Sequence, residues 1–225
     1  MNFGIILAAG KSQRVGPKVD KAFLNLGNKP VLAYSLLAFE KCPDIDGVIL
    51  VVHRGRIEGA RVMAQMFGCS KVAKVVAGGL KRQISVSNGL AQLNDDVDIV
   101  AVHDGARPCV TPQLISETIK YAKRYGSGVA SLKVTDTVKQ VDKGLTITKT
   151  IDRSNLWTVQ TPQTFKIELL QKAFKAVKKK KITITDEASA VELVCHNVHL
   201  VPSELPNVKI TTADDLVLAA TLLKL

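Results

Sequence analysis

A segment rich in small and basic residues follows the first apolar stretch of the sequence. Residues 4–10 read GIILAAG, and four cations come soon after them, at Lys11, Arg14, Lys18 and Lys21. Small residues let a backbone approach a ligand closely, and clustered cations attract a polyanion. Five residues separate Gly4 from Gly10, so the spacing misses the P-loop pattern G-x-x-x-x-G-K-[ST]. Taken alone, the segment is most simply a solvated basic turn after a buried strand.

Further candidates follow two later apolar segments. The stretch GGLKRQISV (78–86) leads into a predicted helix start, where free N–H groups favour anions or polar base edges. Its candidate residues are Gly78, Gly79, Arg82 and Ser85. The stretch HDGARP (103–108) and later segments add Asp104, Arg107, Thr137, Arg153 and Lys209. Each has a local explanation, such as capping or a surface position, but together they predict one crevice.

The residue types that the glycine-rich loops lack limit the reactions that these loops could catalyse. The histidines lie outside the glycine-rich loops, so the sequence indicates neither a Ser-His-Asp nor a Cys-His arrangement. A nucleophile that is already anionic at neutral pH needs no such base. It needs cations that bring two anions together and stabilise a leaving pyrophosphate. Attack of a phosphate on a nucleoside triphosphate is a reaction of this kind.

The elements that must position these residues alternate along the chain. Apolar segments at 3–8, 46–52, 73–77, 97–102 and 128–134 predict strands. Helical periods separate them at 30–41, 56–67, 83–93 and 111–125, with Pro30 and Pro112 at first helical positions and Thr111 as a cap. This alternation predicts a parallel sheet covered by helices on both faces. In such a sheet, ligand loops lie at the carboxyl ends of the strands.

The alternation of apolar segments and helical periods stops after Val134. Residues 135–165 are polar, alternating and turn-rich, with a predicted turn at Lys143 and Gly144, and we expect a projecting β-arm over 135–160. Regular α/β structure resumes with helices at 166–177 and 186–196, a strand near 197–201 and a helix from Thr212. The run 178–181 of four lysines reads as a solvated loop. No linker or repeat is evident, which predicts a single domain over 1–225.

Composition limits the classes of protein. The chain has 225 residues, 46% of them hydrophobic, and no apolar run approaches the ~20 residues of a membrane span. Four scattered cysteines without a C-x-x-C pair indicate a reducing cytoplasm. His196 and His199 lack the further ligands of a metal site. The net charge of +11 suits either nucleic acid or a polyphosphate substrate, and only 4% aromatic residues argue against base stacking on single strands.

Seven motifs in order resemble a known family. They are LAAGKSQR, GGLKRQISV, VHDGARP, VTDTVK, RSNLWTVQTPQTF, TDEASAVE and NVKITTADDL, and they extend from about Gly4 to Leu216. Together they resemble the 2-C-methyl-D-erythritol 4-phosphate cytidylyltransferases of non-mevalonate isoprenoid biosynthesis. The resemblance implies a Rossmann-like nucleotidyltransferase fold, CTP and Mg²⁺ as requirements, and a cytoplasmic (or plastid) homodimer joined through the arm.

The resemblance also implies roles for individual residues. The nucleotide loop would comprise Ala8, Ala9 and Gly10. Transition-state stabilisation on the triphosphate would come from Arg14 and Lys21. The cytosine would be met, largely through backbone atoms, by Gly79, Leu80 and Ser85. Asp104 would lie beside the ribose, the metal and the acceptor. Contacts to the acceptor would come from Arg107, Thr137, Arg153, Thr161, Thr185 and Lys209, with arm residues supplied by the neighbouring subunit.

Two departures and two alternatives accompany this interpretation. Position 80 is Leu where the family often has Asp, and Gly105 replaces a common Ala. The change at position 80 should matter little if that contact is made by the backbone. The change at position 105 should have no effect. The nearest alternative is the related ribitol 5-phosphate cytidylyltransferase, which shares fold and chemistry. The alternative from another class is a nucleic-acid-binding protein that uses the basic charge.

Overall fold

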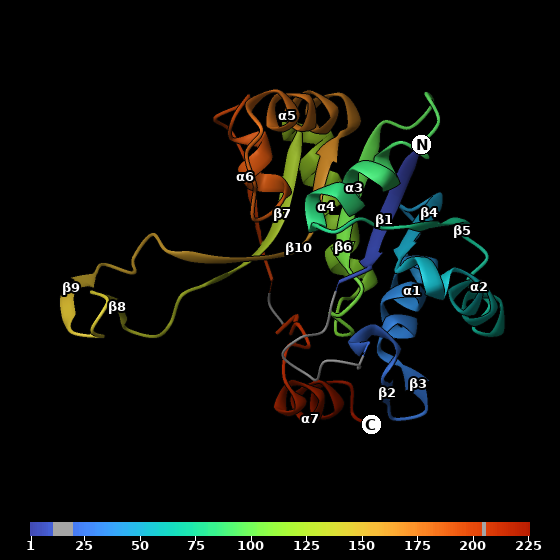
Figure 1. The fold of residues 1–225 in the computed structure, drawn as a ribbon, viewed down its shortest axis with the longest axis horizontal. Coiled ribbons are helices and arrows are strands. Elements are labelled where there is room, and N and C mark those ends of the chain that lie inside the picture. Colours follow the sequence, from blue (N-terminus) through green and yellow to red (C-terminus); the bar gives the residue numbers. More distant parts are fainter. Residues whose placement is uncertain (11–19, 204–205) are drawn as a thin grey trace.

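The computed structural model describes residues 1–10, 20–203 and 206–225. Within these ranges, seven strands form a sheet in the order β11-β7-β10-β6-β1-β4-β5 (Figure 1). Their bounds are β1 Asn2–Ala8, β4 Gly47–Val52, β5 Val72–Ala77, β6 Ile99–Asp104, β7 Ser127–Lys133, β10 Trp157–Lys166 and β11 Leu200–Pro202. Strand β10 pairs antiparallel with both of its neighbours, and every other pairing is parallel. The mostly parallel α/β sheet predicted from the sequence is confirmed.

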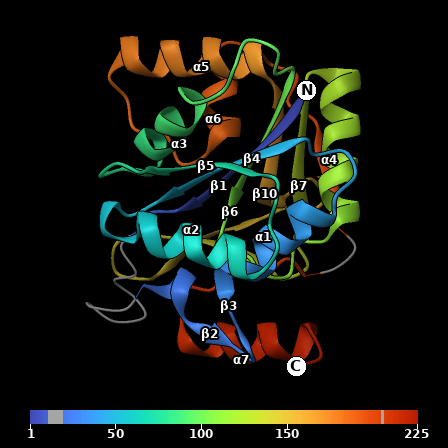
Figure 2. The same ribbon diagram turned by 90° about the vertical axis from the view of Figure 1, so that its right-hand side faces the viewer.

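Helices cover both faces of this sheet (Figure 2). One face carries α1 (Val31–Lys41), α2 (Ile57–Met66) and α4 (Pro112–Tyr125). The other carries α3 (Arg82–Leu90), α5 (Ile167–Lys180) and α6 (Glu187–Val191). Because both faces are covered, β4 and β6 are buried along their whole length, which explains why β4 is apolar throughout and β6 is apolar as far as Val102.

A smaller layer lies beyond the carboxyl ends of the central strands. It contains the last helix, α7 (Ala213–Leu222), and a two-stranded sheet of β2 (Asn25–Leu26) and β3 (Lys29–Pro30). Leu26, Ile210 and Ala219 are among the residues of its own apolar cluster. The capping box predicted for α7 is present, since the Asp215 carboxylate accepts the N–H group of Thr212 at 2.8 Å.

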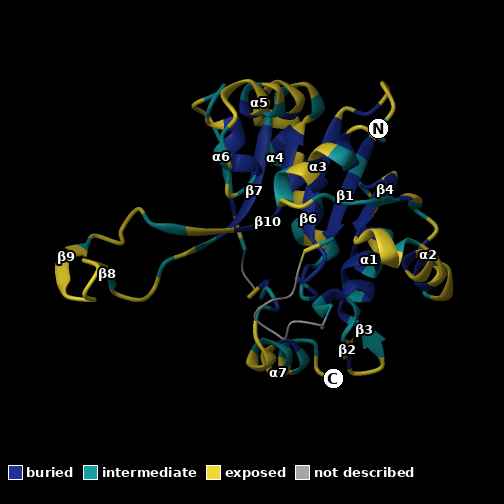
Figure 3. Ribbon diagram, viewed as in Figure 1, coloured by how far each residue is buried: buried dark blue, intermediate teal, exposed yellow. Residues whose placement is uncertain are grey.

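The arm projects from the body of the molecule (Figure 1). Its antiparallel strands are β8 (Val138–Val141) and β9 (Ile147–Ile151), and nearly all their residues are exposed (Figure 3). At the tip, Oδ1 of Asp142 accepts the N–H groups of Gly144 and Thr146, both at 2.9 Å. Strand β10 starts at Trp157, so the expected arm range of 135–160 includes four residues of the central sheet, 157–160.

Four other local expectations need correction. Pro30 precedes the first turn of α1 as its cap, and the helix expected over 83–93 ends at Leu90. The helix expected over 186–196 ends at Val191, after which Leu193 and Val194 donate to carbonyls three residues back in tight turns. Lys178–Lys180 form the last turn of α5, where cations interact favourably with the helix dipole. By contrast, Thr111 caps α4 and Pro112 opens it, as predicted.

Two short 3₁₀ helices complete the described structure, at Lys21–Phe23 and Arg54–Arg56. Among the helices of the described ranges, none has both the length and the apolar character needed to cross a bilayer.

Candidate functional site

A pocket of about 520 Å³ opens at the carboxyl ends of β1, β4, β5 and β6. The chain leaves β1 toward β4 on one side and later adds β6 on the other, so the strand order reverses here. Such a reversal is where open α/β sheets bind ligands. Of the residues predicted to form a site, the pocket is lined by Ala8, Ala9, Gly10, Lys21, Gly79, Leu80, Arg82, Ser85, Asp104 and Lys209.

Backbone forms much of one wall of this pocket. A Cβ atom on Gly78 would lie 2.3 Å from that of Ala9, so the turns after β1 and β5 pack together only because Gly78 has no side chain. Ser85 is buried, and its hydroxyl accepts the N–H group of Gly79 at 3.0 Å. The Ser85 hydroxyl therefore holds the glycine turn in place. Leu80 is 93% exposed, so its side chain packs against little of the protein.

The pocket attracts anions. Its described lining includes five cationic side chains and two carboxylates, which are Lys21, Arg54, Lys81, Arg82, Lys209, Asp20 and Asp104. An excess of positive charge in a recess lined partly by small residues suits a polyphosphate.

Asp104 lies at the centre of this charge distribution. Its Oδ2 accepts from Nζ of Lys209 at 2.6 Å and its Oδ1 from Nε of Arg82 at 3.1 Å. Burial opposes ionisation of Asp104, but the charges of Arg82 and Lys209 outweigh it and hold the pKa of this carboxyl well below its usual value. Asp104 is therefore ionised at any physiological pH.

Arg82 and Glu187 form a pair that the sequence does not reveal. Both terminal nitrogens of Arg82 donate to the carboxylate of Glu187, at 2.6 and 2.9 Å, while its Nε reaches Asp104. The sequence correctly predicts Arg82 at a helix start, but nothing local shows what it pairs with, and Glu187 has no predicted role. The signal that could have found this pair is the acidic first residue of α6, whose other residues read ASAV and carry no charge.

Thr161 and Arg107 face inward, away from the pocket lining. The Thr161 hydroxyl accepts the N–H group of Asp104 at 3.0 Å and contacts Nδ1 of His103 at 3.0 Å. Arg107 donates through Nη1 to the carbonyl of Asn207 at 2.6 Å, and its Nε is buried without a partner. Burial lowers the pKa of His103 to about 3, so its imidazole is neutral. These side chains support the loop that carries Asp104.

Three predicted residues lie away from the pocket within one chain. Arg153, at the base of the arm, donates to the carbonyl of Thr135, and Thr137 is exposed on the same segment. Thr185 is exposed and contacts Asp186 and Ser189 next to α6. Arg14 lies outside the described residues.

The described lining of the pocket contains two carboxylates that could hold a divalent cation, Asp104 and Asp20. The described residues contain no group of three or more His, Cys, Asp or Glu that could hold a metal by themselves. Mg²⁺ commonly binds through one or two carboxylates together with substrate phosphates and water, so a carboxylate such as that of Asp104 in a phosphate pocket fits that ion. Both Asp104 oxygens already accept from cations, but a carboxylate offers about four lone-pair positions.

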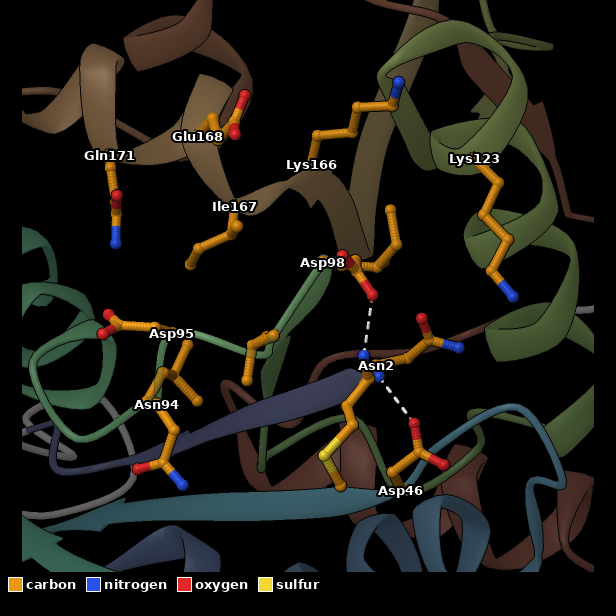
Figure 4. Close-up of a pocket in the computed structure, with 14 residues that line it drawn as sticks. Asn2, Asp46, Asn94, Asp95, Asp98, Lys123, Lys166, Ile167, Glu168 and Gln171 are labelled. Carbon is orange, nitrogen blue, oxygen red and sulfur yellow. Dashed lines mark hydrogen bonds and ion pairs between the residues drawn. The ribbon is translucent and has the colours of Figure 1, made fainter.

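A larger hollow of about 780 Å³ lies at the opposite end of the sheet (Figure 4). There the terminal ammonium group of Met1 pairs with Asp98 at 2.7 Å, and Asp46 accepts the N–H group of Asn2 at 2.6 Å. These contacts anchor the start of β1. The described lining of the hollow combines four carboxylates with two lysines and the terminal ammonium group, so it lacks the excess of positive charge that suits a triphosphate.

Comparison with known proteins agrees with this geometry. The sequence profile of the family described as 2-C-methyl-D-erythritol 4-phosphate cytidylyltransferase matches residues 3–225. The protein of that name from Alkaliphilus oremlandii is 39% identical over 221 residues, covering 98% of this chain and 94% of that protein.

Solved structures agree as well. The 4-diphosphocytidyl-2C-methyl-D-erythritol synthase from Anaerococcus prevotii superposes with a TM-score of 0.87 at 26% identity, covering 100% of this chain and 96% of that one. The 2-C-methyl-D-erythritol 4-phosphate cytidylyltransferase from Thermus thermophilus gives 0.81 at 31% identity, covering 99% and 98%. The Rossmann-like fold expected from the motifs is thereby confirmed. This chain belongs to the 2-C-methyl-D-erythritol 4-phosphate cytidylyltransferase family.

Proposed function

We propose that this protein transfers the cytidylyl group of CTP to 2-C-methyl-D-erythritol 4-phosphate, giving 4-diphosphocytidyl-2-C-methyl-D-erythritol and pyrophosphate. The observation that carries the proposal is the cationic pocket with a glycine-rich wall at the strand-order reversal. The backbone after β1 and β5 suits a nucleotide, and Lys209 with Asp104 stands where an acceptor would approach. Family membership supports the same substrates.

The reaction needs orientation and charge more than a base. A phosphate oxygen of the acceptor forms a bond to the α-phosphorus of CTP, and the bond from that phosphorus to the bridging oxygen breaks, so pyrophosphate leaves with the electron pair. Lys21 and Arg14 would stabilise charge on the triphosphate in the transition state. Lys209, fixed by Asp104, would hold the incoming phosphate in line with the leaving group.

We propose Mg²⁺ as the cofactor, held by Asp104 together with the phosphates of CTP. When bound, the ion neutralises charge on the triphosphate and on the leaving pyrophosphate. The pairing of Asp104 with Lys209 and Arg82 fixes its carboxylate and keeps it ionised for this task.

We also propose a homodimer in which the arm completes the neighbour's site. Apolar side chains are exposed on the arm, with Val141 at 43%, Ile147 at 60% and Leu145 at 82%. An isolated two-stranded hairpin is marginally stable, so contact with a second subunit would stabilise it. Such contact would bring Arg153 and Thr137 to the partner's acceptor. The range 1–225 would form one domain and the arm its dimerisation element.

The cytoplasm is the compartment we infer. Cys42, Cys69, Cys109 and Cys195 are free thiols in the structure, as a reducing compartment would keep them. No nucleic-acid partner is proposed, because cations of the pocket would bind the triphosphate.

One assay tests the function. Pyrophosphate release is measured with saturating CTP and Mg²⁺, with each sugar phosphate in turn. We expect release that depends on 2-C-methyl-D-erythritol 4-phosphate. Ribitol 5-phosphate should be poorer, by ~10–200-fold if one methyl contact worth ~1–3 kcal/mol decides it. Equal or better rates with ribitol 5-phosphate would overturn the acceptor, and release independent of any acceptor would overturn the transfer itself.

A further inference from the structure

Glu187 is a completely buried carboxylate next to the pocket. It is the first residue of α6, its side chain is 0% exposed, and its only partner of opposite charge in the described structure is Arg82. Burying a carboxylate costs several kcal/mol unless it is paired with good geometry. The pair here is bidentate, at 2.6 and 2.9 Å, which is the strongest arrangement between these groups.

Because Glu187 fixes the guanidinium of Arg82, it also fixes a side chain that lines the pocket. A guanidinium is a rigid plane, so fixing its two terminal nitrogens on Glu187 also fixes the direction of Nε. That Nε donates to Oδ1 of Asp104 at 3.1 Å, and Oδ2 of Asp104 accepts from Lys209 at 2.6 Å. Glu187, Arg82, Asp104 and Lys209 therefore form one row of alternating charges. Arg82 and Asp104 line the pocket, whereas Glu187 does not.

Glu187 is itself held by the fold. Gln163 of β10 donates to Oδ2 of Asp186 at 2.9 Å and accepts the N–H group of Ala188 at 2.9 Å. Asp186 caps α6 through its contact with the N–H group of Ser189 at 3.0 Å. The residues on both sides of Glu187 are thus tied to the central sheet, and its carboxylate has a fixed position.

We propose that Glu187 is a positioning residue for the transfer, acting through Arg82 to set the orientation of Asp104 and leave one of its oxygens to Lys209. Without the Glu187 charge, both terminal nitrogens of Arg82 would turn to Asp104, to which its Nε already donates, and compete with Lys209 for it. The inference rests on the proposed cytidylyl transfer.

The first test compares Glu187→Gln with Val191→Ala. Gln keeps the size of the side chain and accepts one hydrogen bond but removes the charge. Val191 is 0% exposed on the same helix, so its truncation weakens packing and leaves the charged row intact. We expect kcat to fall ~10–100-fold in Glu187→Gln, as for other outer partners of reacting groups. KM for CTP should stay close to that of the wild type. Val191→Ala should lower Tm and keep kcat.

A double-mutant cycle tests whether Glu187 acts through Arg82. The double variant Arg82→Gln with Glu187→Gln should have a kcat no lower than that of Arg82→Gln alone. The reason is that Arg82→Gln by itself already removes the side chain through which Glu187 would act. Arg82→Lys keeps the positive charge, but a single ammonium group cannot replace the planar guanidinium that contacts both carboxylates at once. This variant should therefore also have a lower kcat. Wild-type kcat in Glu187→Gln or in Arg82→Lys, or effects that multiply in the cycle, would overturn the inference.

A crystal structure of Glu187→Gln separates this inference from the proposed reaction. We expect the terminal nitrogens of Arg82 to contact Asp104 and the contact between Lys209 and Asp104 to lengthen. Unchanged positions of Arg82 and Lys209 would overturn the positioning role whatever the activity. Failure of the wild-type protein to transfer a cytidylyl group would overturn the proposed function alone.

Discussion

The ammonium group of Lys209 lies 2.6 Å from Oδ2 of Asp104, although 105 positions separate the two residues in the chain. Asp104 ends a central strand, and Lys209 lies in the segment that leads to the last helix. Their contact joins the central sheet to the layer built around α7. In the proposed reaction, this cation would lie beside the acceptor phosphate as that phosphate attacks the triphosphate.

Lys209→Ala should lower kcat strongly. Removing a well-aimed donor typically costs ~10²–10³ in turnover, and Asp104 would be free to turn toward Arg82. The measurement is pyrophosphate release with both substrates varied in turn. Lys172→Ala is the matched control, since Lys172 is exposed on α5 far from any proposed contact. A rise in KM with kcat unchanged would contradict an aligning role.

Arg14→Ala and Lys21→Ala should each reduce kcat more than they weaken CTP binding. Lys21 lines the pocket, and both cations are proposed to act on charge that develops at the α-phosphate and leaving group. We expect a loss of ~10²–10³ in kcat. Equilibrium binding of CTP, measured by calorimetry beside steady-state rates, separates the two effects. Intact kcat with weaker binding would assign these cations to ground-state affinity.

Two inactive variants should restore one another if the site is shared. In a mixed dimer of Arg153→Ala with Lys209→Ala, one site has both wild-type residues and the other has neither. Random exchange would regenerate roughly a quarter of the wild-type sites. The variants are mixed under conditions in which subunit exchange is verified by mass spectrometry. Absence of recovered activity despite exchange would place the whole site in one chain.

Acidification should destabilise the protein through His103. Burial holds its folded-state pKa at about 3, against 6.5 for the ordinary group, so the unfolded chain binds more protons between these values. The free energy of unfolding should therefore fall as the pH drops below about 6.5, by up to about 1.4 kcal/mol per pH unit.

Urea unfolding at pH 5 to 7 measures this slope. His103→Asn should flatten it, and His196→Gln, a substitution of an exposed histidine, is the control. An identical slope in His103→Asn and the wild type would rule out this source of acid sensitivity.

Duplex DNA should bind weakly despite the net charge of +11. The basic residues are dispersed, and we expect a Kd of ~10⁻⁴–10⁻⁶ M that weakens steeply with salt. Fluorescence anisotropy with labelled duplexes at several salt concentrations measures it. Sequence-selective binding at nanomolar concentration in physiological salt would contradict the assignment of these cations to a small polyphosphate.

Local sequence is sufficient to locate one side of the pocket. Parallel strands buried on both faces have nearly continuous apolar sequences, and parallel strands end at a common edge. The residues at or just beyond the ends of those strands, such as Gly10, Gly79 and Asp104, can therefore be grouped from the order of the apolar segments alone. Strong local signals also predict the Thr111 cap and the Asp215 capping box.

Strand β10 shows where polarity is a poor guide to exposure. Gln163 and Thr164 are buried, but each has a partner from elsewhere in the chain: Gln163 contacts Asp186, and Thr164 donates to the Thr118 hydroxyl at 2.8 Å. A buried polar side chain is tolerated when it is hydrogen-bonded, and the sequence shows the side chain without showing the bond. Only the packed sheet decides which polar positions lie inside.

The row of alternating charges formed by Glu187, Arg82, Asp104 and Lys209 is decided by tertiary structure alone. The sequence by itself determines that Arg82 opens a helix and that Glu187 lies in the first turn of another, since both facts depend on neighbouring residues. Their contact depends on how the sheet brings α3 and α6 to the same face. Ion pairs between elements 105 residues apart depend on a few ångströms of relative placement, because the interaction falls with distance and with exposure to water. Local propensities carry no information at that scale.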